Sequence, residues 1–340
     1  MTNEGDTKHN ILWFNTPVRI AITGGSGALG SALIEHLIAD GAERIVTFTR
    51  CQHKRNTMIA RWGHYPGIAD RIYWHDLSDI DQLEQTFRRC EVVVHAAAAK
   101  VVGAHPDEPV GLKRTNITGT HNVLKAAERA GVRRVLVISS DKAVQPTNAY
   151  GVSKAYAEAI AVAHNVHSWP RDTRVSAIRY GNVLGSTGSV VPVFQAAVAK
   201  QRPIHLSDVR MTRFWLTLPQ AVGHVLHAVS VMRGGEVFVP MLPAAPLVRV
   251  AEAVCGKGYP QIITGIRPGG EKLHEQLLGE DDVRRTKLWR GYYVVMPSSR
   301  TWDGTPWPGE LVSPDLLYRS DVWPQQLSVE EIRRLLTGAV

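Results

Sequence analysis

Short apolar runs alternate with longer amphipathic segments through the first half of the chain. The apolar runs have the length and the Val and Ile content of strands that are buried on both faces of a sheet. They lie at residues 18–22, 44–49, 72–74, 92–94, 135–138 and 175–178. Segments with helical periodicity lie between them, at residues 31–41, 79–87, 116–131 and 149–163. A regular alternation with right-handed crossovers predicts an α/β protein with a doubly wound parallel sheet.

A glycine-rich turn follows the first predicted strand. Its glycines have the spacing G-x-x-G-x-x-G and stand between that strand and the next helix. Glycine allows the tight turn and lets backbone amides reach a pyrophosphate at the helix N-terminus. The pattern therefore predicts a Rossmann-type dinucleotide site, and the alternative is a turn without a ligand. The residues that we expect to hold the cofactor here are Thr23, Gly24, Ser26, Gly27, Ala28, Leu29 and Gly30.

The end of the second predicted strand distinguishes two cofactors. An NAD site commonly has Asp or Glu at this position for the ribose hydroxyls. Here the sequence at 49–55 reads TRCQHKR and contains no acid. Arg50 and Lys54 suit a 2′-phosphate, so we predict NADP. NAD remains the alternative, in which these cations are only surface residues.

Further cofactor contacts are expected after the third and fourth strands. Asp76 and Leu77 are placed to face an adenine edge, although Asp76 could instead cap the helix at 79–87. The small side chains of Ala96, Ala97 and Ala98 let the backbone approach a flat ring, as a nicotinamide-ribose wall requires. Two more residues have roles that the sequence leaves open. Lys100 could reach a phosphate or the substrate, or it could be solvated. Asn116 could hydrogen-bond to the backbone near the active site, or it could cap its helix.

The fifth strand leads into the candidate catalytic residues. It ends in Ser139, Ser140, Asp141 and Lys142, where we expect Ser139 to face the cofactor and Ser140 the substrate. Tyr150 and Lys154 follow one helical turn apart, so both can face one pocket above the carboxyl end of the sheet. A cation so close lowers the pKa of a phenol from about 10. Chance occurrence of Tyr-x-x-x-Lys on an exposed helix is the alternative, which the upstream dinucleotide motif disfavours.

After residue 180 the alternation gives way to short motifs. We expect residues 17–180 to form the NADP-binding core. Residues 181–340 would form a smaller C-terminal α/β substrate-binding lobe, with some segments returning to the core sheet. The segments predicted there are a helix at 189–200, a strand and helix at 210–229, a strand at 236–240, a turn and charged helix start at 266–278, a wrapped Trp- and Pro-rich segment at 302–307, and a closing helix at 329–336.

Composition limits the possible partners. The chain has 340 residues and a formal net charge of +8, but its basic residues are scattered and not interleaved with aromatic ones, which disfavours nucleic acid. Its three widely spaced cysteines argue against a disulfide framework or zinc site and for a reducing compartment. The polar N-terminus is unlike a signal peptide, and no apolar run is long enough to span a bilayer. We therefore expect a cytoplasmic protein without a metal or a membrane partner.

The motifs together resemble the extended short-chain dehydrogenase/reductase superfamily. Within it, they resemble the inverting UDP-N-acetylglucosamine 4,6-dehydratases of bacterial polysaccharide synthesis. The resemblance spans roughly residues 18–336 and rests on TGGSGALG, HAAAAK, SSDKAVQPTNAYGVSK, RYGNVLGSTGSVVP, RMTRFW, GGEVFVP and IRPGGEKLHE. Asp141-Lys142 is the discriminating pair, because ordinary 4,6-dehydratases have Asp-Glu there and epimerases have neither pair. The family's catalytic residues carry over to Asp141, Lys142 and Tyr150, with Lys154 supporting the tyrosine.

The resemblance also implies a substrate, UDP-N-acetylglucosamine or a related UDP-sugar, and a homo-oligomer, either dimer or hexamer. Arginines at the substrate site suit a diphosphate, and their alternative role is salt bridging. Two departures leave the exact sugar open: the segment VVGAHPDEP after Lys100, and an extra glycine in IRPGGEKLHE. The substrate contacts that carry over are Lys100, Ser140, Asn182, Val183, Arg210, Arg213, Arg267 and Glu271.

The implied mechanism has three stages. Tyr150 takes the 4-hydroxyl proton while the C4 hydride passes to the cofactor. Lys142, as a neutral amine, removes the acidified C5 proton, and Asp141 protonates the departing 6-hydroxyl. Hydride then returns to C6 and a proton to C5, with inversion. Burial near other cations could neutralise Lys142, and the alternative is a salt bridge to Asp141.

Two other functions remain open. A C4 or C5 epimerase, or a bifunctional dehydratase/epimerase, would share the cofactor site, Tyr150 and Lys154 but leave Asp141 and Lys142 without a dehydration role. A redox-sensing binding protein would keep the fold without catalysis. Such proteins typically lose the Tyr-Lys pair, and this chain retains it.

Overall fold

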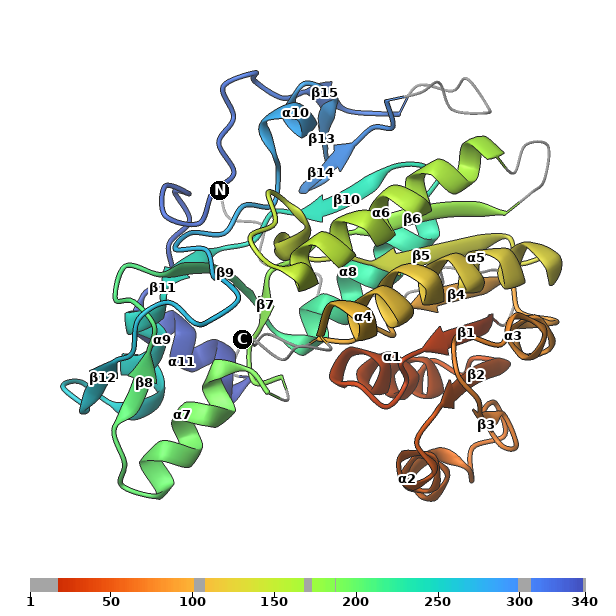
Figure 1. The fold of residues 1–340 in the computed structure, drawn as a ribbon, viewed down its shortest axis with the longest axis horizontal. Coiled ribbons are helices and arrows are strands. Elements are labelled where there is room, and N and C mark those ends of the chain that lie inside the picture. The colour runs from red at the N-terminus through yellow and green to blue at the C-terminus, as the bar shows by residue number, and fades with distance from the viewer. Residues whose placement is uncertain (1–17, 101–107, 168–172, 187, 299–306, 339–340) are drawn as a thin grey trace.

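The structure is a computed structural model that describes residues 18–100, 108–167, 173–186, 188–298 and 307–338. Within these residues a ten-stranded sheet crosses the molecule (Figure 1). Its parallel strands are β1 (Arg19–Thr23), β2 (Arg44–Thr49), β3 (Ile72–Trp74), β4 (Val92–His95), β5 (Arg134–Ile138), β6 (Arg174–Ile178) and β10 (Val237–Pro240). Its antiparallel edge is β14 (Tyr292–Val295), β13 (Thr286–Trp289) and β15 (Glu310–Leu311). The order is β15-β13-β14-β10-β6-β5-β4-β1-β2-β3.

Helices cover both faces of this sheet. Because β1 and β2 lie on one side of the strand-order reversal and β4 and β5 on the other, right-handed crossovers place their helices on opposite faces. Helix α5 contacts α3 and α6 in one layer, and α1 contacts α8 in the other. Figure 1 shows α5 and α6 running along the same face. The helices of this region are α1 (Ala28–Ala39), α2 (Gln52–Trp62), α3 (Ile80–Phe87), α4 (Glu108–Leu112), α5 (Gly119–Arg129), α6 (Ala149–His167) and α8 (Leu218–Val231).

A smaller group of elements lies beside the carboxyl ends of the parallel strands, at the lower left of Figure 1. It contains two small sheets, ordered β11-β9-β7 and β12-β8. The strands are β7 (Asn182–Val183), β8 (Ile204–Leu206), β9 (Thr212–Leu216), β11 (Ala244–Pro246) and β12 (Gln261–Ile263), and the helices are α7 (Val190–Ala199), α9 (Leu247–Cys255) and α11 (Val329–Thr337).

The predicted α/β class and doubly wound sheet are confirmed, and the predicted strands match the observed ones to within one residue at either end. Segments of the C-terminal half return to the large sheet as β10, β13, β14 and β15. The division of the chain at residue 180 stays a prediction.

One predicted element is wrong. The charged helix start within 266–278 is absent, and residues 271–277 form an extended segment with isolated bridges from His274 to Thr212 and from Gln276 to Arg319. Helical spacing of charges there is overridden by pairing with β9 and with the chain near residue 319. A short helix, α10 (Glu280–Val283), follows. Of the Trp- and Pro-rich segment, residues 302–306 lie outside the described residues, and Trp307 is buried.

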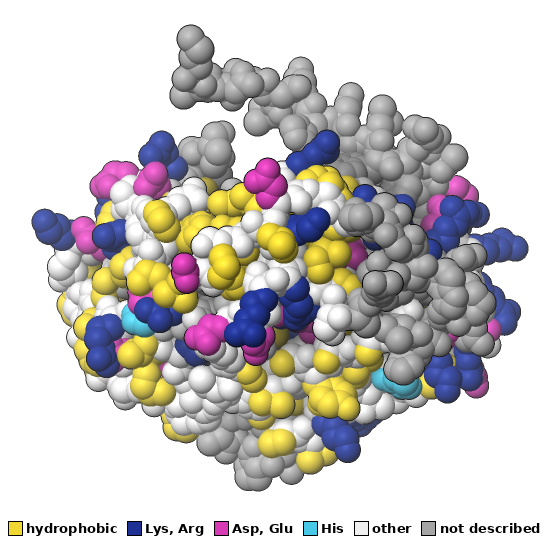
Figure 2. Space-filling model, turned by 90° about the horizontal axis from the view of Figure 1, so that it is seen from above, with side chains coloured by type: hydrophobic (Ala, Val, Ile, Leu, Met, Phe, Trp, Pro, Cys, Tyr) yellow, Lys and Arg dark blue, Asp and Glu magenta, His cyan; other side chains and the backbone are white. Residues whose placement is uncertain are grey.

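Charges are mixed on the face of the molecule that Figure 2 shows. Lys and Arg side chains alternate there with Asp and Glu, and apolar side chains separate them. The described side chains on this face therefore form no continuous basic stripe of the kind that binds a nucleic acid. Among the described helices, none has the length and apolarity required to cross a membrane.

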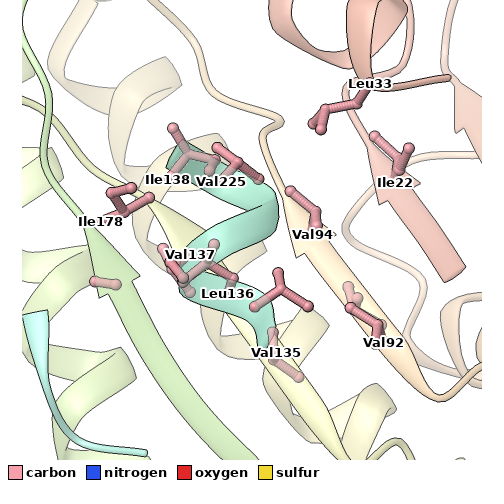
Figure 3. Packing of buried hydrophobic residues seen from close by; sticks show 14 of the residues in the cluster. Ile22, Leu33, Val92, Val94, Val135, Leu136, Val137, Ile138, Ile178 and Val225 are labelled. Atoms are coloured by element: carbon pink, nitrogen blue, oxygen red, sulfur yellow. The ribbon is translucent and has the colours of Figure 1, made fainter. Parts of the chain in front are cut away.

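The core lies on both sides of the central strands. β5 has four consecutive fully or nearly fully buried side chains after Arg134, as its apolar run predicts. Figure 3 shows Val225 of α8 next to the β5 side chains, and Leu33 of α1 near Ile22 of β1. Packing on both faces of the sheet fixes the position of the carboxyl end of β5, and therefore the position of the residues that follow it.

A buried ion cluster links α6, the helix that carries Tyr150 and Lys154, to the C-terminal half of the chain. Arg179, 6% exposed, donates from Nε and Nη2 to the Glu158 carboxylate of α6. Its Nη1 donates to Asp282 of α10 at 2.6 Å. A fully hydrogen-bonded guanidinium between two carboxylates satisfies charges that would otherwise be costly to bury.

The Arg179→Met substitution should therefore be strongly destabilising. It leaves Glu158 as an uncompensated buried charge, at a cost of about 3–5 kcal/mol in the free energy of unfolding, while Asp282 keeps its ion pair with Arg285. Urea unfolding measures this loss. Arg129→Met is the matched control, since its ion pair with Asp81 is exposed and is worth at most about 1 kcal/mol. Equal losses in the two variants would contradict the assignment of Arg179.

Candidate active site

The turn after β1 has the open backbone that a bound phosphate requires. Gly24 has a φ of +75°, and a Cβ atom there would lie 2.7 Å from the Ala97 amide nitrogen. A Cβ atom at Gly30 would overlap the Gly24 carbonyl oxygen. Gly27 is the N-cap of α1 and has no side chain above the first helical amides. The turn therefore fits a pyrophosphate at the helix N-terminus, while Ala28, Leu29 and Gly30 belong to α1 itself.

Buried hydrogen bonds support this turn from below. The Thr23 hydroxyl accepts from the Ala97 amide at 3.0 Å and shares a hydrogen bond with His95 Nδ1 at 2.8 Å. His95 Nε2 shares another with the Thr120 hydroxyl at 3.0 Å. Burial and the Lys154 cation lower the pKa of His95 to about 3, so its ring is neutral. Thr23 thus holds the ends of β1 and β4 together.

Asn116 extends the network to the catalytic helix. It lies in the π-helical turn Lys113–Thr118, and its side chain accepts from the Ala99 amide at 2.7 Å and donates to the Ala99 carbonyl at 3.0 Å. It also donates to the Ser153 hydroxyl at 2.8 Å, which donates to the Tyr150 carbonyl at 2.7 Å. The structure gives Asn116 the backbone-binding role and not the helix-capping one.

A cavity of about 290 Å³ opens beside the glycine turn. Arg50, Lys54 and Arg114 are the cations that line it, and each of the two arginines lies 3.8 Å from Asp76. The expected cofactor residues along it are Gly24, Ser26, Gly27, Arg50, Lys54, Asp76, Leu77, Ala96, Ala97 and Ala98. The lining that sequence analysis did not assign is Phe48, Thr49, Cys51, His75, Ala99, Arg114 and Thr115.

Asp76 does not cap α3. Its carboxylate accepts from the Ser78 amide at 3.0 Å, while Asp79 is the N-cap and accepts from the Gln82 amide at 3.0 Å. The capping alternative for Asp76 is therefore wrong, since the helix begins three residues later than that role requires. Asp76 is left facing the cavity.

The turn Asp141–Ala143, which carries the candidate catalytic residues Asp141 and Lys142 and is called the catalytic turn below, follows β5 directly. Ser140 caps the 3₁₀ turn Asp141–Ala143 by accepting from the Lys142 amide at 3.2 Å, and its hydroxyl donates to Asp141 Oδ1 at 2.6 Å. Asp141 is 1% exposed. Ser139 is also buried, and its hydroxyl has no hydrogen-bond partner among the described residues. An orphaned hydroxyl at this edge fits a bound cofactor or sugar.

The charge state of Lys142 differs from the one that the implied mechanism needs. Its Nζ lies 2.9 Å from Asp141 Oδ2 and 2.8 Å from Glu275 Oε1. The Lys142 side chain is 27% exposed along its length, but its amine is surrounded by protein atoms, and this burial disfavours the charged form. The two carboxylates outweigh burial and raise the pKa of Lys142. The prediction of a neutral Lys142 is therefore wrong for this structure, and the salt bridge to Asp141 is observed.

Tyr150 and Lys154 are both buried at the start of α6, against the catalytic turn. Burial and the Asp141 carboxylate raise the pKa of Tyr150, opposite to the direction that sequence spacing predicts. Lys154 directs its amine to the Ile138 carbonyl oxygen at 2.5 Å. Burial lowers the pKa of Lys154 to about 8, against the opposing effect of Glu158.

The expected substrate residues fall into two groups. Lys100 is exposed as a residue, but its amine is partly buried. This burial and the nearby cations Lys142 and Arg267 lower the pKa of Lys100, while the Asp141 carboxylate has the opposite effect. Lys100 thus lies near the catalytic turn, and Arg267 lies near Lys100 and pairs with Glu271. Asn182 and Val183 form β7, where Asn182 Oδ1 is buried without a partner among the described residues.

The other two arginines are placed differently. Arg210 is exposed and pairs with Asp208 at 2.7 Å. Arg213 is only 7% exposed. Its Nη1 donates to the Thr212 and Leu273 carbonyls at 2.8 and 3.0 Å. In this structure Arg213 is an internal ion and not an open ligand for a diphosphate.

The extra glycine forms part of a contact with the catalytic loop. Gly269 and Gly270 have φ values of +92° and +93°, and a Cβ atom at Gly270 would lie 2.7 Å from the Thr147 carbonyl oxygen. Asn148 donates to the Gly270 carbonyl at 3.0 Å and accepts from the Gly151 amide at 2.9 Å, at the beginning of α6. The glycine turn therefore supports the loop that leads to Tyr150.

Sequence analysis missed three charged residues near the site: Arg114, Lys272 and Glu275. Arg114 lies just before the helix that was expected to begin at Asn116. Nothing in the local sequence distinguishes it from a surface cation. Lys272 and Glu275 lie in the charged run that was predicted to be helical. As an extended segment, it directs both toward the catalytic turn.

These features define the class of the protein, a Rossmann-type short-chain dehydrogenase/reductase. The solved structure of Pen from Bacillus thuringiensis has a TM-score of 0.85 to this chain, with 27% identity, and covers 96% of this chain and 98% of its own. A dTDP-glucose 4,6-dehydratase from Streptomyces venezuelae, solved with NAD bound, shares the fold at a TM-score of 0.64 and 20% identity, over 75% of this chain and 86% of its own.

The chain belongs to the polysaccharide biosynthesis protein family, which matches residues 20–297. It is 34% identical over 323 residues to the inverting UDP-N-acetylglucosamine 4,6-dehydratase of Campylobacter jejuni, covering 92% of this chain and 95% of that protein. A UDP-glucose 4-epimerase of Rickettsia typhi is 32% identical over 288 residues, 83% of each chain. The family predicted from the motifs is confirmed.

Gly270→Ala should disturb the catalytic loop. The new Cβ atom would press on the Thr147 carbonyl, and alanine at this φ is strained by about 1–3 kcal/mol. Displacing the loop before Tyr150 should reduce turnover about ten- to a hundredfold. Gly265→Ala is the control, because Gly265 has a φ of +80° and no heavy atom within 4 Å of its Cβ position. If both variants lose turnover equally, the contact has no role.

Proposed function

We propose that this protein is a lyase that converts UDP-N-acetylglucosamine to a UDP-4-keto-6-deoxy hexosamine with inversion at C5. The observation that carries the proposal is the Asp141–Lys142 pair, 2.9 Å apart at the end of β5 and beside buried Tyr150. An acid next to an amine suits removal of water across C5 and C6, and a phenol suits proton transfer at the 4-hydroxyl. The identity to the Campylobacter jejuni dehydratase supports the same reaction.

The cofactor that we propose is NADP, with NAD as the alternative. The glycine turn would hold its pyrophosphate, and Arg50, Lys54 and Arg114 would hold a 2′-phosphate. Ala96, Ala97, Ala98 and the Ser139 hydroxyl would lie along the rest of it. When bound, the nicotinamide supplies a hydride acceptor and donor, so oxidation at C4 and reduction at C6 need no second redox substrate.

Tyr150 would take the proton of the 4-hydroxyl. Because burial and Asp141 raise the pKa of Tyr150, its phenolate needs a compensating cation. Lys154 lies one helical turn along and is the group placed for this. With a pKa of about 8, Lys154 remains mostly protonated at neutral pH.

Lys142 would remove the C5 proton after passing its own proton to Asp141. The transfer crosses the 2.9 Å contact from Nζ to Oδ2: an N–H bond breaks, an O–H bond forms, and the charge of the site is unchanged. The free amine then takes the C5 proton, and the carboxylic acid protonates the leaving 6-hydroxyl, which departs as water. That step regenerates the ion pair. Inversion requires that a proton return to C5 on the face opposite the one that Lys142 deprotonates. The proton that Tyr150 took from the 4-hydroxyl would be delivered there, so that Lys142, Asp141 and Tyr150 all end in their starting protonation states.

For the substrate we propose contacts from Lys100, Ser140, Asn182, Val183 and Arg267. Lys100 is close enough to Asp141, Lys142 and Arg267 for their charges to shift its pKa. The unpaired Asn182 oxygen would accept from the nucleotide or sugar. Roles for Arg210, Arg213 and Glu271 would require their present ion pairs to be exchanged for the substrate.

An epimerase, or a bifunctional dehydratase/epimerase, is the alternative, favoured by the 32% identity to a UDP-glucose 4-epimerase. It would use the same cofactor, Tyr150 and Lys154. It would not release water, so product analysis separates the two functions.

We also propose a homo-oligomer in the cytoplasm. Val152 and Tyr156 of α6 are 52% and 56% exposed, and Val110 of neighbouring α4 is 70% exposed, which supports an apolar contact between copies. The cysteines Cys51, Cys90 and Cys255 are free thiols, as is typical of a reducing compartment.

The product test is incubation with UDP-N-acetylglucosamine and NADP in heavy water, followed by proton NMR. We expect a 6-methyl signal, deuterium at C5 and couplings of the L-arabino keto-sugar. The same methyl with D-xylo couplings would keep the dehydration but overturn the role of Lys142 in inversion. A C4 epimer without a methyl signal would establish the epimerase instead.

NADP preference has its own prediction. Arg50→Ala should weaken NADP binding about tenfold or more, because it removes a charge-assisted contact to the 2′-phosphate, and should leave NAD binding nearly unchanged. Titration calorimetry with each nucleotide measures both affinities. Arg61→Ala on α2 is the control, as this arginine pairs with Glu35 outside the cavity. Equal losses for NAD and NADP would overturn the assignment.

A further inference from the structure

Glu275 is a buried charge that the proposed reaction does not yet use. It is 1% exposed. Its Oε1 lies 2.8 Å from Lys142 Nζ and 3.7 Å from Arg213 Nε, and its Oε2 lies 3.4 Å from Lys272 Nζ. The carboxylate therefore stands directly against the amine that would act at C5.

The backbone of Glu275 is fixed on both sides. Its amide donates to the Ser320 hydroxyl at 2.9 Å, and its carbonyl accepts from the Ser320 amide at 2.9 Å. Bridges from His274 to Thr212 and from Gln276 to Arg319 hold the neighbouring residues. A carboxylate on so constrained a segment has a defined position.

The same segment also holds the backbone of the catalytic turn. Lys272 Nζ donates to the Asp141 carbonyl at 3.0 Å and to the Val144 carbonyl. Lys272 thus fixes the turn while Glu275 fixes the Lys142 side chain. Both contacts cross from the C-terminal half of the chain to the end of β5.

The charges around Lys142 come from four parts of the fold. Glu275 and Asp141 are the carboxylates that contact its amine, and their effect exceeds that of burial and of Arg213. Burial also acts on Glu275, but Lys142, Arg213 and Lys272 lower the pKa of Glu275 to about 2 and keep it ionised. The charged groups that face Lys142 are Asp141 of its own turn, Glu275 and Lys272 of the 271–277 segment, Arg213 of β9, and Lys100 after β4.

We propose that Glu275 is a positioning residue for Lys142, which holds the amine beside Asp141, keeps it charged in the resting enzyme, and so sets the pH above which the Lys142–Asp141 pair loses the proton that the proposed reaction uses. The inference rests on the proposed dehydratase function for its catalytic meaning. Glu275 stabilises the ammonium side of the proton transfer from Lys142 to Asp141. It therefore opposes that transfer until the site is ready to react.

The sign of the effect follows from the charges. Replacing Glu275 by Gln removes one of the two carboxylates that favour the ammonium and leaves Arg213, which disfavours it. The pKa of Lys142 must then fall. We expect a fall of at least about one unit, which is a tenfold loss of proton affinity. The Lys142–Asp141 pair should then lose its proton to solvent at correspondingly lower pH.

NMR titration of isotope-labelled lysine in the full chain tests this without substrate. The signal of Lys142 is assigned by its loss in Lys142→Met. Its apparent pKa should fall in Glu275→Gln and remain at the wild-type value in Glu236→Gln. Glu236 is an equally buried carboxylate, bound to Ser176 and to backbone amides away from Lys142. An unchanged titration of Lys142 in Glu275→Gln would overturn the inference.

A second variant keeps the test decisive if Glu275→Gln does not fold. Glu275→Asp withdraws the carboxylate by one methylene and should give a smaller shift in the same direction. No shift in a folded Glu275→Asp, together with an unfolded Glu275→Gln, would make Glu275 purely structural and overturn the proposal.

The pH profile of dehydration provides the catalytic readout. Because Asp141 needs the proton of Lys142 to protonate the leaving hydroxyl, activity should fall at high pH as that proton is lost to solvent. The pH of this fall should move down by the same amount as the pKa of Lys142 in Glu275→Gln. If the titration shifts but the wild type forms no dehydrated product, the proposed function fails while the electrostatic role of Glu275 stands. If dehydration is observed and its pH profile is unchanged in the variant, the role of Glu275 fails alone.

Discussion

The structure depends on a chain of buried hydrogen bonds along the carboxyl edge of the parallel sheet. It runs from Thr23 at the end of β1 through His95 at the end of β4 to Thr120 of α5. Thr120 bonds to Asn116, which connects the chain of hydrogen bonds to Ser153 of α6. His95 takes part as a neutral ring, which allows it to share bonds with two hydroxyls. The network is satisfied internally, so it positions the cofactor turn and the catalytic helix relative to each other without using groups that a ligand would need.

A second constraint comes from the far end of the sequence. Arg179 ties α6 to α10, and the 271–277 segment directs Lys272 and Glu275 at the turn that follows β5. Charges that decide the state of Lys142 therefore come from both halves of the chain. The predicted division between a cofactor-binding core and a substrate-binding lobe would not separate the chemistry, because residues after position 180 supply the ions that contact the proposed base and acid.

Sequence patterns were sufficient for the parallel sheet, since apolar runs such as that of β5 are buried on both faces and leave little choice of structure. They also placed the glycine turn and brought Tyr150 and Lys154 to one end of α6, because spacing along a helix fixes direction. They failed where long-range contacts decide. The charged run before residue 278 has helical spacing but pairs with β9, so the role of Glu275 was not predicted. For the same reason the pKa of Lys142 was expected to fall, whereas the structure raises it. The pKa of Tyr150 was predicted to fall but is raised, because its local sequence indicates neither its burial nor its proximity to Asp141.

The central claim is that one site oxidises C4, eliminates water across C5 and C6, and returns the same hydride to C6. The most direct test is to supply the protein and NADP with UDP-N-acetylglucosamine that carries deuterium at C4, and to locate the label in the product by NMR. The account predicts a singly deuterated 6-methyl group, with no label released to solvent. Deuterium that remains at C4, or a methyl group without the label, would contradict it.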